Sequence, residues 1–415
     1  MLDVLAIASR NLLRYRRRTL LTLLLIVIGM IAVLLFIAVA GSFKSMMVDQ
    51  ITDSVLGHLQ VHRKGYVASI DNLPLNLNMK PAMVAKTEEA LKANPAVATW
   101  SPRVKFGGLY CNFAETTSIR VNGIDPAREA ATVPLLQGRM LDGPKAGALV
   151  EKGKIVIPLL LARGMKSKVG DTVVVVATNR DGSVNGKTFV VQGILESISG
   201  PGGRDGYIHI DDARELLRMT EAEVSEIAVR LKEFSRLELA TGQIKKALEG
   251  LTNKEGKPVI EVHTWADLSP FSNLAKMIDL MTLFIKVVLV SIVLVSVMNV
   301  MIMAVFERIR EIGTIAAIGT PPSRILSLFL AEGLMLGIAG TVAGTLLSLA
   351  AIFGINVWKP TFAFGQQQNL VMAPTIAGGD VLTIAALVVV VAVIASLQPA
   401  WKASRMDPIS ALRHV

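Results

Sequence analysis

The chain has 415 residues, of which 52% are hydrophobic and 18% are charged, and its formal net charge is +10. This balance is typical of a membrane protein with a substantial water-soluble part, and the length allows two domains of ordinary size. The positive charge is not accompanied by a basic patch interleaved with aromatic residues, so the sequence argues against a nucleic-acid-binding protein.

Residues 1–18 predict a positively charged helix at the start of the chain. Apolar side chains recur at three- and four-residue steps, opposite a group of arginines, at Leu5, Ala8, Leu12 and Tyr15. This pattern favours an amphipathic helix that lies in the cytoplasmic interface of a membrane. A plain helical lead-in to the next segment is the alternative.

Four apolar runs are long enough to cross a hydrocarbon core, which takes about 20 helical residues. They are residues 19–41, 277–306, 325–353 and 380–398. A cleavable signal peptide competes for the first run, because Ala38-Val39-Ala40 resembles a cleavage site. The run exceeds the roughly 7–15 apolar residues of a signal-peptide core, so we expect an uncleaved anchor.

Lysines and arginines near the ends of these runs predict the orientation of the chain. They are frequent before the first run, between the second and third, and after the fourth, whereas the loop 354–379 holds only Lys359. Positive residues favour the cytoplasmic side. We therefore expect cytoplasmic termini, including the tail 399–415, and a short outer loop at 354–379. The long segment 42–276 is expected to form a folded domain outside.

The outer segment reads as a mixed α/β domain. Strands are expected at 57–63, 97–113, 118–123, 171–177, 187–194, 207–210, 226–231 and 258–263, and helices at 82–93, 211–219 and 236–251. One arrangement pairs the strands of 58–106 with those of 226–263 in a single α/β layer. The β-rich segment 118–220 would then be inserted as a second lobe, with a flexible loop at 200–203. Residues 265–277 are expected to continue as a helix into the second run.

Other motifs in the outer segment predict no nucleotide site, metal site or disulfide. Gly186-Lys187-Thr188 lacks the earlier glycine of a phosphate-binding loop and opens a predicted strand rather than a helix. His58 and His62 lie on a predicted strand, where residues four apart are about 13 Å from each other, so we expect no metal site. Cys111 is the only cysteine, which excludes an internal disulfide.

A short charged turn separates the second and third apolar runs. It carries Glu307, Arg308, Arg310 and Glu311, and each charge would cost about 2.5–3.5 kcal/mol or more at the centre of a bilayer. The turn must therefore lie at a membrane surface. Ile312, Ile315 and Ile318 would give a short helix within 307–324 one apolar ridge. We expect this helix to contact a separate soluble motor protein; an ordinary connecting loop is the alternative.

The third apolar run contains four glycines and one carboxylate. Gly333, Gly337, Gly340 and Gly344 allow close helix packing, either within one subunit or between two copies. Glu332 is expected to be paired and structural, because it lies nearer the cytoplasmic end of the run than its centre. A place in a transport pathway is the alternative.

These residues resemble the FtsX-like permeases, the membrane subunits of type VII ABC transporters, which include the MacB and lipoprotein-release (LolC/LolE) branches. The turn matches as Glu307-Arg308-x-Arg310-Glu311-Ile312-Gly313-Thr314, then Ala317-Ile318-Gly319-Thr320 and Arg324. The tail matches as Pro399-Ala400-x-x-Ala403-Ser404-x-x-Asp407-Pro408-Ile409-x-Ala411-Leu412-Arg413. In the outer segment, Val121-x-Gly123-Ile124-Asp125-Pro126 and Leu136-x-Gly138-Arg139 resemble the MacB-type periplasmic core.

The resemblance implies a non-catalytic permease subunit of the bacterial inner membrane, with four spans and a large periplasmic domain. The turn would be the coupling helix, and its contacts with the ATPase would be Glu307, Arg308, Arg310, Glu311, Ile312, Gly313 and Arg324. ATP and Mg would be bound by two copies of a separate cytoplasmic ABC ATPase, with no cofactor on this chain. Further expected partners are a second permease copy or paralogue, membrane lipid, and a periplasmic lipoprotein or adaptor.

The lack of a recognisable ATPase segment favours the lipoprotein-release branch over MacB proper, which has a fused ATPase domain. The expected function is release or export of a lipoprotein, a lipid or another amphiphile, driven by ATP hydrolysis in the partner. The alternatives are a signalling subunit that controls a periplasmic cell-wall hydrolase, and a MacB-like permease for drug or peptide efflux.

Overall fold

A computed structural model describes residues 7–8, 10–12, 14, 16–144, 146–197, 205–253, 255–364, 367–407 and 411. Leu5, Tyr15, the predicted loop 200–203, and 408–410 and 412–415 of the tail lie outside the described residues. The chain divides into a helical unit (1–45, 276–361 and 371–415) and a sheet-containing unit (46–275 and 362–370). Each is described by itself.

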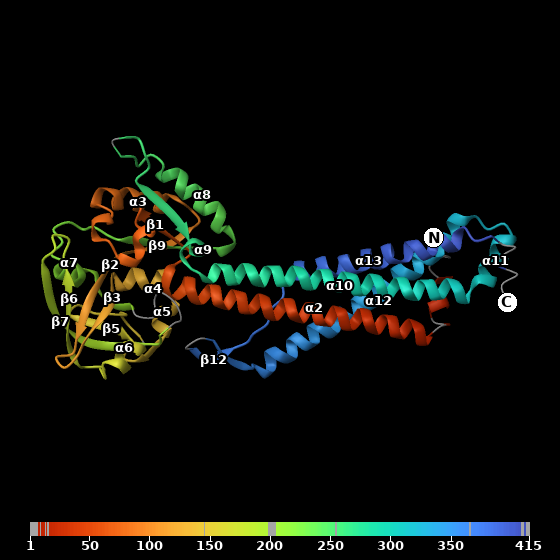
Figure 1. Cartoon of the computed structure of the whole chain (residues 1–415), viewed down its shortest axis with the longest axis horizontal. Helices are drawn as coiled ribbons and strands as arrows, with labels where there is room; N and C mark the ends of the chain where they lie inside the picture. The colour runs from red at the N-terminus through yellow and green to blue at the C-terminus, as the bar shows by residue number, and fades with distance from the viewer. Residues whose placement is uncertain are drawn as a thin grey trace. The chain divides into compact units, whose positions relative to one another are not determined.

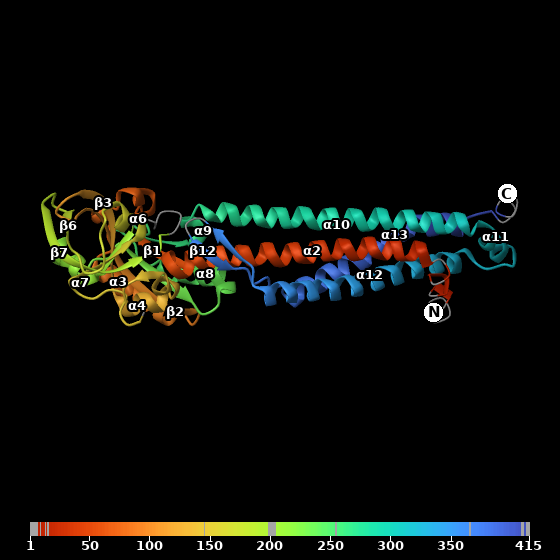
Figure 2. The same cartoon turned by 90° about the horizontal axis from the view of Figure 1, so that it is seen from below.

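Four long helices form the core of the helical unit, and each is long and apolar enough to cross a membrane. They are α2 (Arg16–Ile51), α10 (Phe271–Glu307), α12 (Pro322–Trp358) and α13 (Gly378–Ser404), which run side by side (Figures 1 and 2). At 1.5 Å per residue, a 37-residue helix such as α12 is about 55 Å long, which exceeds the roughly 30 Å hydrocarbon core. The helices therefore begin earlier or end later than the apolar runs, and α13 extends into the predicted tail.

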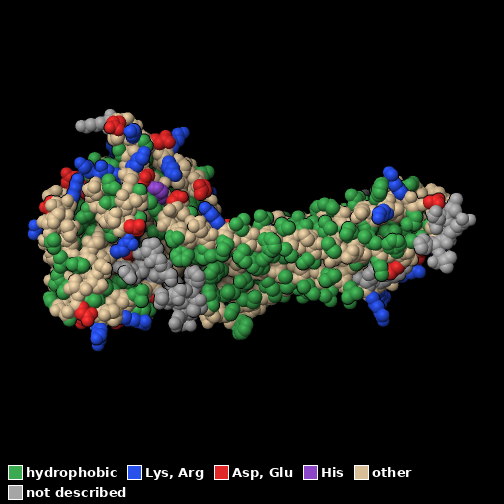
Figure 3. All heavy atoms as spheres, viewed as in Figure 1, with side chains coloured by type: hydrophobic (Ala, Val, Ile, Leu, Met, Phe, Trp, Pro, Cys, Tyr) green, Lys and Arg blue, Asp and Glu red, His purple; other side chains and the backbone are tan. Residues whose placement is uncertain are grey.

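One apolar cluster joins the four helices. Ile26 and Met30 of α2, Val297 of α10, Leu336 of α12 and Ala392 of α13 are all buried in it. The outward faces are also apolar, and Figure 3 shows hydrophobic side chains covering the middle of the helices. Leu20, Leu283 and Leu346 are among the exposed ones. An apolar surface of this extent is unstable in water, so these faces are suited to lipid.

The sheet-containing unit is built on a ten-stranded mixed sheet. Its strands are β1 (Leu59–Arg63), β2 (Val97–Cys111), β3 (Thr116–Ile124), β4 (Met140–Asp142), β5 (Lys154–Pro158), β6 (Thr172–Thr178), β7 (Val184–Leu195), β8 (Asp205–His209), β9 (Glu226–Leu231) and β10 (Ile260–Thr264). Their order is β10-β1-β9-β2-β3-β8-β5-β7-β4, and β6 pairs with β2 and β7. The strands of the two segments expected to share a layer are thus neighbours. The β-rich middle belongs to the same sheet, because the long strand β2 pairs with β9 in one half and with β3 and β6 in the other.

Short helices cover this sheet. They are α3 (Pro81–Ala93), α4 (Pro126–Thr132), α5 (Leu135–Gly138), α6 (Leu159–Gly164), α7 (Ile210–Leu216), α8 (Leu237–Leu248) and α9 (Trp265–Leu268), with 3-10 turns η2 (Val67–Asn72), η3 (Leu75–Leu77) and η5 (Phe234–Arg236). A π-helical turn, η1 (Thr52–Leu56), follows α2. The two strands β11 (Thr361–Phe364) and β12 (Gln367–Val371) form a small separate sheet in the segment expected to be a loop.

The helix expected at 265–277 is present but is interrupted at Ser269 and Pro270. Thr264 caps α9 through a reciprocal pair of bonds with Asp267, and α9 ends after Leu268. Ser269 is extended, and Pro270 has no N–H to continue a helix. The helix α10 therefore begins anew at Phe271.

Candidate functional site

The charged turn of the helical unit has three pieces, and the short helix expected within 307–324 is the middle one. Glu307 ends α10, α11 covers Ile309–Ala317, and Arg324 lies in the first turn of α12. Arg308 breaks the helix with φ −116° and ψ 18°. Gly319 at φ +98° ends the turn after α11, in a conformation that favours glycine, and Pro321 and Pro322 start α12.

Arg308 anchors this turn to the third span. Its Nη1 lies 2.9 Å from Oε1 of Glu332, and its Nε lies 3.0 Å from Oε2 of Glu311. Only 6% of Arg308 and 2% of Glu332 is exposed. A buried arginine needs paired acceptors, because an isolated charge in an apolar interior is costly. The two carboxylates therefore fix α11 against α12.

The N-terminal segment joins the same cluster. Asn11 donates from Nδ2 to Oε1 of Glu332 at 2.7 Å, and Arg14 Nη1 lies 3.4 Å from Oε1 of Glu311. Leu12 packs against the apolar cluster of the four helices. The described residues between 7 and 14 are helical. No feature of the sequence pointed to Asn11, because a single asparagine on the polar side of a helix is ordinary.

The helix α11 has an inner and an outer face. Ile309, Ile312 and Gly313 are buried, whereas Arg310, Thr314 and Ala317 are exposed. Ile318, directly after the helix, is 80% exposed. The predicted apolar ridge is therefore divided, since Ile312 packs inward and Ile318 faces out. A cavity of about 420 Å³ lies between α11 and α12, lined by Ile312, Ile315 and Phe329 among others.

This arrangement sorts the predicted ATPase contacts into two groups. Glu307, Arg310 and Arg324 are exposed and Glu311 is half-buried, so a partner can reach them. Arg308, Ile312 and Gly313 are buried within the chain. Direct contact of these three with an ATPase stays a prediction, and in this conformation they lie on the inner face of the turn.

The four glycines of α12 lie where other helices of the same chain approach closely. A Cβ on Gly333 would lie 2.5 Å from Oγ of Ser396, and one on Gly337 would lie 2.8 Å from Cβ of Ala392, both on α13. A Cβ on Gly340 or Gly344 would meet Ile26 or Met30 of α2, each at 2.6 Å. Of the two alternatives for these residues, the structure shows packing within one chain.

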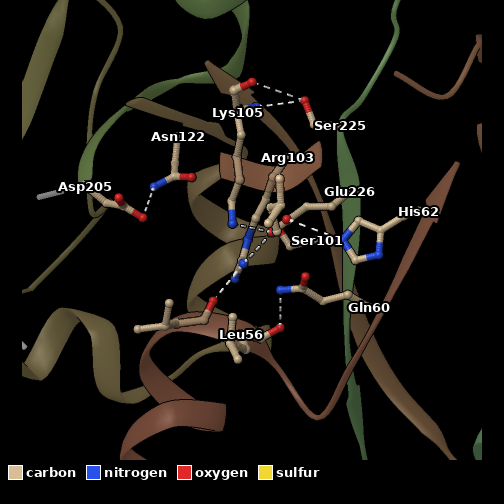
Figure 4. A network of polar contacts seen from close by, with 12 residues as sticks. Leu56, Gln60, His62, Ser101, Arg103, Lys105, Asn122, Asp205, Ser225 and Glu226 are labelled. Atoms are coloured by element: carbon tan, nitrogen blue, oxygen red, sulfur yellow. Dashed lines mark hydrogen bonds and ion pairs between the residues drawn. The ribbon is translucent and has the colours of Figure 1, made fainter. Parts of the chain in front are cut away.

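The sheet-containing unit holds a buried polar network that the sequence did not reveal (Figure 4). Arg103 is paired with Glu129 at 2.7 Å and with Glu226 at 3.0 Å, and Lys105 also lies 3.0 Å from Glu226. Burial by itself would raise the pKa of Glu226, but Lys105, His62 and Arg103 together hold that pKa well below its usual range. These residues come from β1, β2, α4 and β9, so only their pairing in three dimensions brings them together.

Lys187 and the two histidines, whose sequence motifs were considered as binding sites, make contacts within the sheet-containing unit. Lys187 lies on β7 with Nζ 2.8 Å from Oδ1 of Asp212, so it is an ion-paired strand residue. His58 accepts a hydrogen bond from the N–H of Leu231 at 3.1 Å, and His62 Nε2 lies 3.7 Å from Oε2 of Glu226. Among the described residues, no group of three or more His, Cys, Asp or Glu side chains is arranged to hold a metal ion.

Two family models match this chain. The model of the MacB-like periplasmic core domain covers residues 19–247, and that of the FtsX-like permease C-terminal region covers residues 283–408. The first spans more than half of the chain. The chain belongs to the FtsX-like, MacB-type family of ABC transporter permeases. This permease is therefore an inner-membrane protein, and its family implies association with an ABC ATPase.

Relatives of this permease differ in how much of their own length is matched. The lipoprotein-releasing system transmembrane protein LolC of Neisseria meningitidis is 24% identical, over 94% of this chain and 92% of that protein. The macrolide export ATP-binding/permease protein MacB 2 of Aeromonas hydrophila is 26% identical over 98% of this chain, but over only 59% of its own length. The solved periplasmic region of MacB from Actinobacillus actinomycetemcomitans covers 53% of this chain and 92% of its own, at 12% identity and a TM-score of 0.37.

Proposed function

We propose that this permease works with a separate cytoplasmic ABC ATPase, present in two copies, and couples ATP hydrolysis to movement of its periplasmic domain. ATP and Mg bind to the partner. The observation that carries the proposal is the two-faced helix α11. Its inner face is held by Ile312 and by Arg308 directly before the helix, while Arg310, Thr314 and, directly after the helix, Ile318 face outward. A rigidly held helix can transmit a push from a partner, whereas a mobile loop would absorb it.

The cargo that we propose is a lipoprotein or another amphiphile of the inner membrane. The match to LolC over 92% of that protein's length supports lipoprotein release. The similarity to MacB 2 supports efflux as the second candidate. In a bilayer containing the permease and its ATPase, ATP-dependent release of a lipoprotein to a soluble acceptor supports the first candidate. Transport of a macrolide without lipoprotein release supports the second.

The coupling role is tested by Ile318→Asp, which places a charge on an exposed apolar side chain outside the spans. We expect this variant to reduce co-purification of the ATPase at least about tenfold, because it desolvates a carboxylate in an apolar contact. Lys402→Glu, a charge change at an exposed position near the end of α13, is the matched control. If Ile318→Asp recovered as much ATPase as Lys402→Glu and the wild type, α11 would be rejected as the contact.

A further inference from the structure

The sheet-containing unit has a cavity of about 220 Å³ with two chemically different sides. Its apolar lining includes Val55 and Leu56 of η1, Leu268 of α9 and Phe271 of α10. Its polar lining includes Lys105, Arg120, Asn122 and Asp205, together with Gln60, Asp71 and Ser269. Cavities with apolar walls and a few convergent polar groups are typical of small-molecule sites. Because this one is smaller than the roughly 300–1,000 Å³ of a drug-sized site, it suits one end of a longer molecule.

Strand pairing explains the polar side. Lys105 of β2 is paired with Asn122 of β3, and Arg120 of β3 is paired with Asp205 of β8. Residues two apart on a strand share a face, so all four side chains lie on one face of three adjacent strands. The alternate residues Val104, Phe106, Ile119 and Ile208 belong to the apolar core. The polar side chains thus lie on the face opposite that core, where Asn122 and Asp205 are buried and Lys105 and Arg120 are partly exposed.

Asp205 is the residue that this fold leaves incompletely paired. It is 8% exposed, and its Oδ2 accepts a hydrogen bond from Asn122 Nδ2 at 3.2 Å. Its Oδ1 is buried and has no hydrogen-bond partner among the described residues. Burial raises the pKa of Asp205, although Lys105, Asn122 and Arg120 act against the shift. A buried acceptor without a partner costs about 1–3 kcal/mol, which a ligand carrying an N–H would recover.

Two cations beside Asp205 retain donors for a second group. Lys105 Nζ lies 3.0 Å from Oε1 of Glu226, but an ammonium has three N–H donors. Arg120 donates from Nη2 to the carbonyl of Ile70 at the long distance of 3.4 Å, and its guanidinium has five N–H donors. Figure 4 shows Lys105 and the Asn122–Asp205 pair on the strands, with Leu56 and Gln60 across from them. The cavity lining therefore includes two cations, and the buried Oδ1 of Asp205 is an acceptor without a partner among the described residues.

We propose that this cavity binds the head group and first alkyl carbons of an amphiphile that carries a primary ammonium next to a phosphate. The ammonium donates to Oδ1 of Asp205, and the phosphate accepts from Arg120 and Lys105. The alkyl segment lies between Leu56 and Phe271. This site goes beyond the proposed coupling function and does not depend on it, because it lies in the sheet-containing unit and requires no ATPase.

The test is binding of lysophosphatidylethanolamine to the full chain in an uncharged maltoside detergent, measured by native mass spectrometry. Lysophosphatidylcholine is the matched ligand, because its trimethylammonium has no N–H. We expect the ethanolamine lipid to bind about 10- to 100-fold more tightly, the range for one charge-assisted hydrogen bond. Equal binding of the two lipids would overturn the proposal.

Variants locate the binding to this cavity. Asp205→Asn is expected to remove the preference for the ethanolamine lipid, whereas Asp142→Asn, an exposed carboxylate change on β4, is expected to keep it. If Asp205→Asn fails to fold, Leu268→Trp fills the apolar side from a half-buried position and is expected to weaken binding of the ethanolamine lipid at least about tenfold. Unchanged ethanolamine-lipid binding by whichever of the two variants folds would overturn the proposal.

Discussion

Arg308 Nη1 lies 2.9 Å from Oε1 of Glu332, and this ion pair connects the end of the second span to the inside of the third. The pair is separated by 24 residues of sequence and is buried with Asn11 on its other side. The pair explains how one of the four charged residues of the turn can be buried next to two apolar spans. The charge of Arg308 is neutralised inside the chain by Glu332. The pair also fixes the orientation of α11, on which our proposal for the ATPase contact depends.

Glu332→Gln is expected to destabilise the helical unit. The variant leaves Arg308 buried with Glu311 as its remaining carboxylate, and breaking a buried pair costs about 3–5 kcal/mol. The melting temperature of the full chain in detergent measures the loss. The double variant Arg308→Met with Glu332→Leu removes both charges and is expected to recover most of it. If the double variant lost as much stability as Arg308→Met and Glu332→Leu lose together when made singly, the two side chains would not interact.

Gly333→Ala is expected to destabilise the packing of α12 on α13. The new methyl would lie 2.5 Å from Oγ and 2.6 Å from Cβ of Ser396, so α13 must shift. Overpacking of this kind costs about 1–3 kcal/mol. Gly354→Ala, in the same helix with no atom within 4 Å of the added Cβ, is the matched control. The control is expected to be neutral or slightly stabilising, because alanine favours helix more than glycine. A higher melting temperature for Gly333→Ala would contradict the close approach.

Acid is expected to destabilise the periplasmic network through Glu226. Its pKa is lowered in the folded protein from the ordinary value of 4.5, because Lys105, His62 and Arg103 outweigh the effect of burial. The unfolded chain therefore takes up this proton at a higher pH than the folded chain. The stabilising contribution is complete above about pH 4.5 and is lost as the pH falls below that value.

Glu226→Gln tests this expectation. The variant leaves Arg103 and Lys105 without one carboxylate, so we expect a loss of about 3–5 kcal/mol at pH 7 and a smaller further loss on acidification. Melting temperatures of the full chain between pH 7 and pH 4 measure both. Asp205→Asn is the comparison. Burial raises the pKa of Asp205, so ionisation of this residue lowers the stability of the folded protein as the pH rises, which is the opposite of the pH dependence expected from Glu226. A wild-type acid slope in Glu226→Gln would rule out Glu226 as its source.

Cysteine labelling tests the orientation of the chain. Cys111 is first replaced by Ser, and single cysteines are then introduced as Arg310→Cys in α11 and Ser183→Cys in the turn between β6 and β7. An impermeable thiol reagent added to intact cells is expected to label position 183 and not position 310. In inside-out vesicles the pattern is expected to reverse. Labelling of both positions from one side would show that the turn and the sheet lie on the same side of the membrane.

The sequence alone determined the membrane class of this protein. Apolar runs of about 20 residues have few stable locations other than lipid, and charges interrupt them only where the chain leaves the hydrocarbon. For the same reason the charged turn between the second and third spans could be found without a structure. The alternation of apolar and polar residues predicted most strands of the outer unit, because alternate residues of a strand face opposite sides of a sheet.

Only the tertiary structure decided which of these residues act together. Arg308 and Glu332, Gly340 and Ile26, and Lys105 and Asp205 are distant in sequence, and local periodicity does not specify such neighbours. The buried position of Arg308 was therefore missed, although its presence in the turn was evident. The polar face of β2, β3 and β8 was missed too, because strand register determines which polar side chains share one cavity.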